Sequence, residues 1–442
     1  MCMCPRWCGR SNGRCAISRK TGRWCVMLTS IDDGPVLDRT RIAGAREENG
    51  PVVLTFLHSF EPGGVERIAL RLVERWQAAG AAAPLFLGRR DGAMATQFDG
   101  RVMIERAPAT WQPIRHYETM WMIVQLARRI RRDRPNLLFA AGNSYAVVAV
   151  AMKLVLGRLC PPVVLKISND LVRPDMGWVG QTLYRLWLRV QGRHIDHFIA
   201  MTGPLADQIE REMAVPSGRI EIIANPSLDE APSVPVTESG QGKKQGRSFC
   251  AVGRLTAQKN LPMMLRAFAL GRKEGDSLTF YGDGPLRTRL MRQARRLGIA
   301  DRVNFAGHLP DVRQALAGHD ALLLSSHYEG MPSVVIEALE AGLHVIATDC
   351  CCSMPRLLED GALGTVVPAG DEQAFARAVR AAPLGQRDPA RARAVADRHR
   401  IDRVAPLYRR LFARLHSDPV GVGQGLLPVP AILSPRKMEA IS

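Results

Sequence analysis

The chain has 442 residues, which is long enough for two domains of ordinary size. Hydrophobic residues make up 46% and charged residues 23%, as in globular proteins, and no run of 18 apolar residues occurs, so no membrane-spanning helix is predicted. The net charge of +18 favours an anionic partner: nucleic acid, an anionic membrane or an anionic substrate.

The first 48 residues hold five of the ten cysteines and show no apolar periodicity. They contain no C-x-x-C pair, which gives little support for a zinc site, and they lack the hydrophobic core of a signal peptide. We expect residues 1–48 to be a disordered or spurious leader, with translation starting at Met27 as one explanation. The other cysteines, Cys160, Cys250 and Cys350 to Cys352, lie in or beside apolar segments, as expected for buried thiols in a reducing compartment.

Residues 49–226 alternate between apolar and amphipathic segments. We expect strands at 51–57, 84–87, 102–105, 137–141, 163–167, 197–201 and 220–224, and helices at 65–80, 117–132, 145–156, 181–192 and 204–213. This alternation predicts a mostly parallel sheet covered on both faces. Ligands bind such sheets beyond the carboxyl ends of the strands. We therefore expect the residues that follow strands, namely His58, Gly63, Asn143 and Asp170, to share one cleft.

Residues 227–246 are rich in Pro, Ser, Gly and Gln and are expected to be a linker. The alternation then resumes over 247–400. We expect strands at 248–252, 277–281, 303–305, 321–324 and 344–347, and helices at 261–270, 287–297, 311–317, 333–341, 374–382 and 390–415. The sequence thus predicts an α/β protein with two doubly wound halves.

The stretch Ser325–Asp349 is the part of the chain richest in chemical groups. Its loop carries Glu329, and Glu337 follows eight residues later, about one turn inside the expected helix. Between the two acids, Gly330 permits close approach of a ligand, and the helix start offers free N–H groups to an anion. A carboxylate suits sugar or ribose hydroxyls, so this unit has parts that fit a sugar, a diphosphate and a ribose. Two solvated acids are the plainer interpretation.

Cationic and glycine-rich loops occur at two other strand ends. Arg254 and Lys259 lie between a strand and a helix, where an anion would bind, since Arg can grip a phosphate with two bonds and Lys adds a mobile charge. Gly63 and Gly64 lie between the first strand and its helix, which is a weaker phosphate signal.

These motifs resemble those of the family-four retaining glycosyltransferases, the group 1 type. The resemblance rests on E-G-x-P-x-x-x-x-E-A from Glu329, V-G-R-L-x-x-x-K-N from Val252 and P-G-G-V-E-R from Pro62, with G-D-G-P-L and F-x-G between them. It extends over roughly 52–415. It implies the GT-B fold, with two Rossmann-like domains, 49–226 and 247–400, facing across a cleft. It further implies that helix 401–416 returns to the first domain through Tyr408, Leu411 and Leu415. Residues 417–442 are expected to be a disordered tail.

The resemblance also implies a function and a site. The expected reaction is retaining transfer of a sugar from a nucleotide-diphosphate sugar, such as a UDP- or GDP-sugar, to a hydroxyl of a lipid-linked or polysaccharide acceptor. Glu329 would orient the sugar, Glu337 would bind the ribose, and Arg254 and Lys259 would hold the diphosphate. The expected donor-binding set is Gly64, Arg254, Lys259, His308, Leu309, Glu329, Gly330, Met331, Pro332, Ser333 and Glu337.

Two mechanisms stay open at this point. A front-face route lets the leaving phosphate take the acceptor's proton, whereas a double displacement uses Glu329 or Asp170 as nucleophile, so both are candidate catalytic residues. No D-x-D follows an apolar strand, and we expect neither a metal nor a cofactor. The chain departs from many relatives in having no His after strand 163–167, and in having Cys351-Cys352-Ser353 where relatives often have Gly-Pro.

Two arginine-rich helices, 117–132 and 181–193, also carry Trp121, Met122, Tyr184, Leu186 and Trp187. Basic amphipathic helices bind anionic membranes, so we expect a cytoplasmic protein at the inner face of the cytoplasmic membrane; core-facing helices with solvated arginines are the alternative. Other functional hypotheses are a nucleotide-sugar epimerase or phosphorylase of the same fold and, more remotely, a nucleic-acid-binding protein. No nucleic-acid-binding motif occurs, so nucleic acid is not an expected partner.

Overall fold

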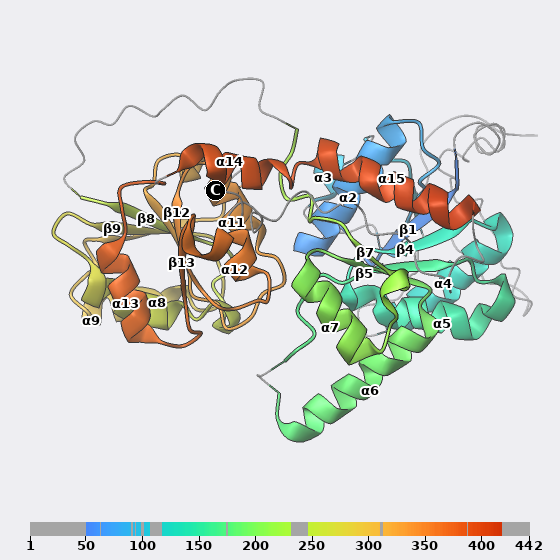
Figure 1. Cartoon of the computed structure of the whole chain (residues 1–442), viewed down its shortest axis with the longest axis horizontal. Helices are drawn as coiled ribbons and strands as arrows, with labels where there is room; N and C mark the ends of the chain where they lie inside the picture. Colours follow the sequence, from blue (N-terminus) through green and yellow to red (C-terminus); the bar gives the residue numbers. More distant parts are fainter. Residues whose placement is uncertain are drawn as a thin grey trace, which may run out of the picture.

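The computed structural model describes residues 50–61, 63–89, 92, 94–98, 101–106, 117–173, 176–230, 246–309, 313–386 and 388–417. The expected leader (1–48), most of the expected linker and all but the first residue of the expected tail lie outside these ranges. Within them, two α/β units lie side by side (Figure 1), each built on one parallel sheet.

The first sheet has seven strands within the described ranges, in the order β3-β2-β1-β4-β5-β6-β7, and all neighbours are parallel. Its strands are β1 (Val53–Leu57), β2 (Leu85–Leu87), β3 (Ile104–Arg106), β4 (Leu137–Ala140), β5 (Val163–Lys166), β6 (His197–Ala200) and β7 (Ile220–Ile222). The α-helices are α2 (Gly64–Ala78), α3 (Ala95–Phe98), α4 (Glu118–Asp133), α5 (Ala146–Leu156), α6 (Trp178–His194) and α7 (Gly203–Met213). The central strands β1, β4, β5 and β6 are buried throughout, as expected for a sheet covered on both faces.

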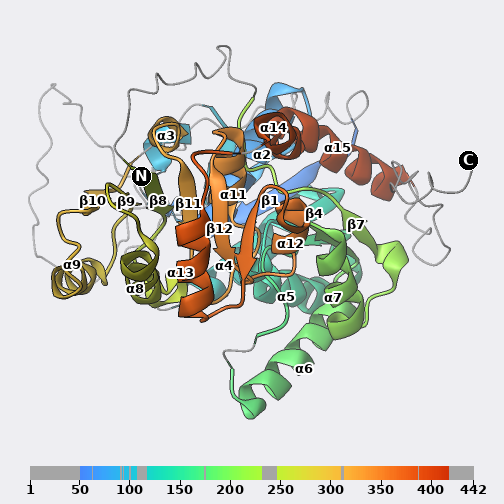
Figure 2. The same ribbon diagram turned by 60° about the vertical axis from the view of Figure 1, so that its left-hand side comes forward.

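In the second unit, the described residues form six parallel strands in the order β10-β9-β8-β11-β12-β13. The strands are β8 (Ser248–Val252), β9 (Ser277–Tyr281), β10 (Val303–Gly307), β11 (Ala321–Leu324), β12 (His344–Thr348) and β13 (Gly364–Val367). The α-helices are α8 (Leu261–Gly271), α9 (Arg287–Arg296), α10 (Arg313–Leu316), α11 (Ser333–Glu340), α12 (Met354–Leu357), α13 (Glu372–Ala381), α14 (Pro389–Asp397) and α15 (Ile401–Ser417). Figure 2 shows the same two units after a turn of 60°. The prediction of two doubly wound α/β halves is confirmed.

Three short elements, α3, α12 and β13, were not expected, because each has only four residues and shows no clear periodicity. The prediction of one helix over 390–415 is wrong. The chain breaks between α14 and α15, because Arg400 pairs with Leu228 in a parallel bridge. No proline or glycine marks this break in the sequence.

Two chain segments pass between the units and are bonded to each other. The N–H of Leu228 donates to the carbonyl of His399 at 3.1 Å, and the N–H of Ile401 donates to the carbonyl of Leu228 at 3.0 Å. The His399 ring nitrogen Nδ1 lies 2.9 Å from the carbonyl of Asn225. The first residues of the expected linker are therefore ordered by pairing with the segment before α15, which a composition rich in Pro and Ser does not reveal.

Helix α15 crosses to the first unit and packs on α2, and the three residues expected to make this contact, Tyr408, Leu411 and Leu415, are buried. The indole N–H of Trp76 donates to the carbonyl of Ala405 at 3.1 Å. The rings of Trp76 and Tyr408 lie 5.7 Å apart. Among the described helices, none combines the length and the apolar content needed to cross a membrane.

The contact of α15 with the first unit leads to a prediction about Tyr408. Its ring is fully buried, but its hydroxyl finds no hydrogen-bond partner among the residues that the structure describes. Tyr408→Ala should lower the free energy of unfolding by roughly 3–5 kcal/mol through the cavity it leaves. Tyr408→Phe is the matched control and should leave stability unchanged or raise it, since it removes only the unpaired hydroxyl. Urea unfolding followed by tryptophan fluorescence measures both; equal losses in the two variants would contradict the account.

Candidate functional site

Lys259 and Glu329, which come from loops 70 residues apart, form a close ion pair. Lys259 Nζ donates to Glu329 Oε1 at 2.6 Å, and the hydroxyl of Ser326 donates to the same oxygen at 2.7 Å. The two side chains are only 17% and 12% exposed, so the pair is largely shielded from solvent. The structure thus brings together the cation expected at the diphosphate and the acid expected at the sugar.

Hydrogen bonds to backbone carbonyls join the loops that carry this pair. The hydroxyl of Ser325 donates to the carbonyl of Lys259 at 2.7 Å, and the N–H of His327 donates to the carbonyl of Gln258 at 2.8 Å. The N–H of Glu329 donates to the carbonyl of Cys350 at 2.8 Å. The loops that follow β8, β11 and β12 therefore form one unit at the carboxyl ends of neighbouring strands, which is where ligands of such sheets bind.

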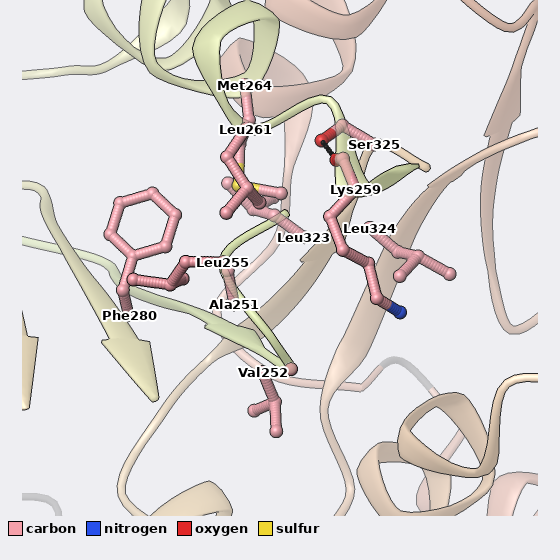
Figure 3. A pocket seen from close by; sticks show the side chains of 11 residues that line it. Ala251, Val252, Leu255, Lys259, Leu261, Met264, Phe280, Leu323, Leu324 and Ser325 are labelled. Carbon is pink, nitrogen blue, oxygen red and sulfur yellow. Dashed lines mark hydrogen bonds between the residues drawn. The ribbon is translucent and has the colours of Figure 1, made fainter. Parts of the chain in front are cut away.

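A small hollow opens beside the ion pair (Figure 3). In this view Phe280 lies on one side of the hollow and Lys259 on the other. Apart from Lys259 and Ser325, the side chains that line it are apolar. The lining residues are Ala251, Val252, Gly253, Leu255, Lys259, Leu261, Met264, Phe280, Leu323, Leu324 and Ser325. An apolar floor with one cation strengthens the field of that cation, because little water screens it.

The first unit contacts the same loop at Gly330. Gly330 and Asn169, which follows β5, form an isolated antiparallel bridge. A Cβ atom on Gly330 would lie 1.7 Å from the carbonyl oxygen of Ser168, so only glycine allows this approach. Asn143 Oδ1 in turn accepts from the N–H of Ser168 at 2.6 Å. Loops after β4 and β5 of the first sheet thus face the loop of Glu329 across the domain boundary.

Asp170, the second candidate catalytic residue, contacts a different part of the second unit. Its Oδ2 accepts from the N–H of Cys352 at 2.7 Å, and the Cys352 thiol lies 3.0 Å from Oδ1. Burial raises the pKa of Asp170, and the hydrogen bonds from Cys352 act against that rise. Asp170 is therefore held by the loop after β12.

The helix α11 carries two of the expected donor-binding residues toward the domain boundary. The Ser333 hydroxyl accepts from the Ser227 hydroxyl at 3.2 Å. Glu337, one turn later, is half-buried. Its charge acts on Arg71 of α2, whose pKa is lowered by burial, with Asp229 and Glu337 opposing that effect. Glu337 therefore lies in the field of a first-domain arginine, a contact between distant parts of the chain that no sequence pattern indicates.

The remaining expected donor-binding residues differ in exposure. Gly64, Arg254 and His308 are exposed and Leu309 is half-buried, whereas Met331 and Pro332 are buried. Gly64 is the first residue of α2. Of the expected donor-binding residues, the structure thus joins Lys259 directly to Glu329, the neighbour of Gly330. The exposed residues lie just beyond a strand or at the start of a helix.

Sequence reasoning missed several polar residues that lie beyond the carboxyl ends of strands, among them Tyr145 and Glu66. The Tyr145 hydroxyl donates to Glu66 Oε1 at 2.8 Å, and the Tyr145 ring stacks on His58 with centroids 5.2 Å apart. These residues lie within three positions of Gly63 and Asn143 or are the expected His58 itself, so their place after strands was the available signal. The Ser326 hydroxyl was also missed, although the same signal was available, because it lies two residues beyond β11.

A buried lysine was also missed. Lys166 at the end of β5 is fully buried, and its ammonium donates to Asn225 Oδ1 at 2.5 Å. Burial lowers the pKa of Lys166 to about 7. Asn225 Nδ2 donates to the Ser227 hydroxyl at 3.1 Å, which continues to Ser333. This row of polar groups connects the first sheet to the start of α11.

Comparisons with known proteins agree on one family. The model described as Glycosyltransferase Family 4 matches residues 62–226, and the model described as Glycosyl transferases group 1 matches residues 246–382. The chain is similar to the lipopolysaccharide core biosynthesis glycosyltransferase LpsE of Rhizobium meliloti, with 30% identity over 198 residues, 42% of this chain and 54% of that protein. It is also similar to the amylovoran biosynthesis glycosyltransferase AmsD of Erwinia amylovora, with 30% identity over 118 residues, 27% of this chain and 33% of that protein. The matches thus span about half or less of the length of these curated relatives.

Among solved structures, Anabaena Alr3699/HepE in complex with UDP and glucose has a TM-score of 0.66 at 19% identity, covering 82% of this chain and 99% of that one. At this identity the likeness shows a shared fold. The two family models together cover the second parallel sheet, six of the seven described strands of the first sheet, and the loops of Lys259 and Glu329. From the matched domains and the GT-B fold, the chain belongs to the family 4, or group 1, glycosyltransferases.

Proposed function

We propose that this protein is a retaining glycosyltransferase that moves a sugar from a nucleotide-diphosphate sugar to an acceptor hydroxyl in the synthesis of a cell-surface polysaccharide or lipopolysaccharide. The observation that carries the proposal is the shielded Lys259–Glu329 pair at the carboxyl ends of the second sheet, against the first domain. The names of LpsE and AmsD support the polysaccharide assignment, and the UDP complex of the Anabaena protein supports a UDP-sugar as donor.

In this proposal Lys259 stabilises the leaving diphosphate. Its ammonium has three N–H donors, and its hydrogen bond to Glu329 uses one of them. Arg254 and the N–H groups at the start of α11 add positive potential. Electrostatic stabilisation by fixed charges in a shielded site is commonly the largest single contribution to catalysis. These groups supply the countercharge that a divalent ion supplies elsewhere, so the proposed reaction is metal-independent.

Glu329 positions the transferred sugar. Among the described residues, both of its side-chain hydrogen bonds go to Oε1, so Oε2 is available to accept from sugar hydroxyls. In the front-face route, the bond from the anomeric carbon to the acceptor oxygen forms as the bond to the phosphate oxygen breaks. The acceptor's proton passes to that phosphate oxygen, and the new bond forms on the face that the leaving group occupied, which retains the configuration.

The Glu329 role is tested with Glu329→Gln, after a thermal-shift screen of UDP, GDP, ADP and their sugars has identified the donor. Turnover should fall by at least about 100-fold, the size of effect seen when one charge-stabilising group is removed. Nucleotide affinity should change little, since Lys259 and the helix amides remain. Nucleotide release and glycosylated product measured together report the turnover.

Glu274→Gln is the matched control. Glu274 is exposed and lies in the turn before β9, at the amino ends of the strands, whereas the site lies at their carboxyl ends. It should have wild-type turnover. Near-normal turnover of Glu329→Gln would refute the proposed role of Glu329. A donor sugar that changes configuration without an acceptor, or a sugar phosphate product, would instead indicate an epimerase or a phosphorylase.

The acceptor is proposed to be lipid-linked, and the enzyme to bind the inner face of the cytoplasmic membrane. On α6, Trp178 is 81% exposed and Leu183 and Leu186 are 63% and 62% exposed. On the neighbouring α5, Leu154 is also exposed, as is Leu159, which lies just after the end of that helix. Both views place α6 along one border of the molecule next to α5. We call the exposed residues Leu154, Leu159, Trp178, Leu183 and Leu186 the α5–α6 apolar surface.

Exposed arginines, Arg158, Arg185, Arg189 and Arg193, accompany this surface. Apolar side chains among cations match the boundary between anionic headgroups and acyl chains. Helix α4 fits less well, because Met122 is buried and Arg129 is buried and paired with Asp133 at 2.5 Å. The core-facing alternative therefore describes much of α4, and the membrane proposal rests on α5 and α6.

Vesicle co-sedimentation tests the membrane proposal. A variant with Trp178→Ser, Leu183→Ser and Leu186→Ser should bind vesicles of phosphatidylglycerol and phosphatidylcholine about 10-fold or more weakly than the wild type, since each buried apolar side chain contributes roughly 1.5–3 kcal/mol. Leu384→Ser, at a leucine of the second domain that is 74% exposed, should bind like the wild type. Salt should weaken wild-type binding. If the wild type fails to bind anionic vesicles at low salt, the proposal is wrong.

A further inference from the structure

We propose that Asp170 is a positioning residue that latches the first domain onto the loop after β12 and thereby fixes the loop of Glu329. Its importance for turnover rests on the proposed function, whereas the latch itself does not. We define the interdomain latch as Asp170 and Thr202 of the first domain with Cys352 and Ser353 of the second.

Both oxygens of Asp170 are engaged across the domain boundary. Oδ2 accepts from the N–H of Cys352 at 2.7 Å, and Oδ1 lies 3.0 Å from the Cys352 thiol. Burial and the charge of Asp170 raise the pKa of Cys352 to about 12. The thiol therefore stays protonated at neutral pH and can donate to the carboxylate. Two donors on one residue fix the carboxylate in both position and orientation.

A second polar contact lies one residue further along the same loop. The hydroxyls of Thr202, which precedes α7, and Ser353 lie 2.8 Å apart. Residues that follow two neighbouring strands of the first sheet, β5 and β6, thus hold two consecutive residues of the second domain. The chain has Cys351-Cys352-Ser353 at this position. The loop therefore offers a thiol and a hydroxyl where a Gly-Pro pair would offer neither.

The latch reaches Glu329 through a short path. The carbonyl of Cys350, two residues before Cys352, accepts a hydrogen bond from the N–H of Glu329 at 2.8 Å. The Thr348 hydroxyl, just before this loop, donates to the carbonyl of Ser326 at 2.7 Å. Displacing residues 350–353 would therefore displace the Glu329 end of the segment 326–329, whose other end is held by Thr348. Asp170 acts through this loop, and the structure gives it no hydrogen bond to Glu329 or Lys259 among the described residues.

The proposal separates Asp170 from residues that bind the nucleotide. Among the described residues, the hydrogen bonds of Lys259 outside its own loop go to Glu329 and Ser325 of the second domain, so nucleotide affinity should survive loss of the latch. The turnover number should fall, because sugar orientation depends on the place of Glu329. Errors of about 1 Å in such a position can cost on the order of 100-fold in rate.

The experiment compares Asp170→Asn, Cys352→Ala and Cys352→Ser in the full-length protein. Hydrogen exchange followed by mass spectrometry should show faster exchange at residues 350–353 in Asp170→Asn and Cys352→Ala, with unchanged exchange at 253–260. With the donor sugar, kcat should fall on the order of 10- to 100-fold in Asp170→Asn while nucleotide affinity stays within about two-fold. Cys352→Ser keeps a donor and should restore much of the protection and turnover.

Several outcomes would overturn the proposal. Wild-type exchange at 350–353 in both Asp170→Asn and Cys352→Ala would show that the latch does not hold the loop. Loss of turnover in Asp170→Asn with wild-type exchange at 350–353 would place Asp170 at the reacting atoms instead. If Asp170→Asn fails to fold, Cys352→Ala decides alone. If no donor sugar is turned over, the exchange data still test the latch while the proposed function fails.

Discussion

The hydrogen-bonded ion pair of Lys259 with Glu329, at 2.6 Å, is the interaction on which the site depends. It joins two loops that follow adjacent strands, β8 and β11, and it places a cation and an acid in a region that water screens poorly. Removing either partner would leave the other as an uncompensated charge that is largely shielded from solvent, which is costly. The pair therefore both holds the two loops together and supplies the opposite charges that transfer of a sugar from a diphosphate requires.

The pair can act only if the first domain comes close enough to complete the site. Gly330 allows that approach, since a side chain there would collide with the carbonyl of Ser168. Two further sets of contacts, away from the Lys259–Glu329 pair, hold the domains in this arrangement. The segments around Leu228 and His399 are bonded to each other, and α15 anchors the end of the second unit on α2 through Trp76. The site is thus a property of the assembled pair of domains.

Much of this could be predicted from the sequence, for reasons that are physical. The central strands are short apolar runs bounded by turn residues, which is typical of strands buried on both faces, and Glu329 and Lys259 lie in the loops that follow two strands of this kind. Short elements at the border, such as β13, carry too little pattern to be recognised. The break before α15 was missed because it results from pairing of Arg400 with Leu228, a contact between distant parts of the chain. The contacts of Asp170 with Cys352 were missed for the same reason.

Direct titration of the nucleotide is the measurement that tests the central claim most closely. If Lys259 holds the diphosphate, calorimetry with UDP, or with whichever nucleotide diphosphate binds the wild type, should show roughly 10- to 100-fold weaker binding to Lys259→Met, because a charged hydrogen bond contributes about 1.5–3 kcal/mol. The matched variant Lys273→Met changes an exposed lysine beyond α8 and should bind like the wild type. Equal affinity of wild type and Lys259→Met would contradict the account.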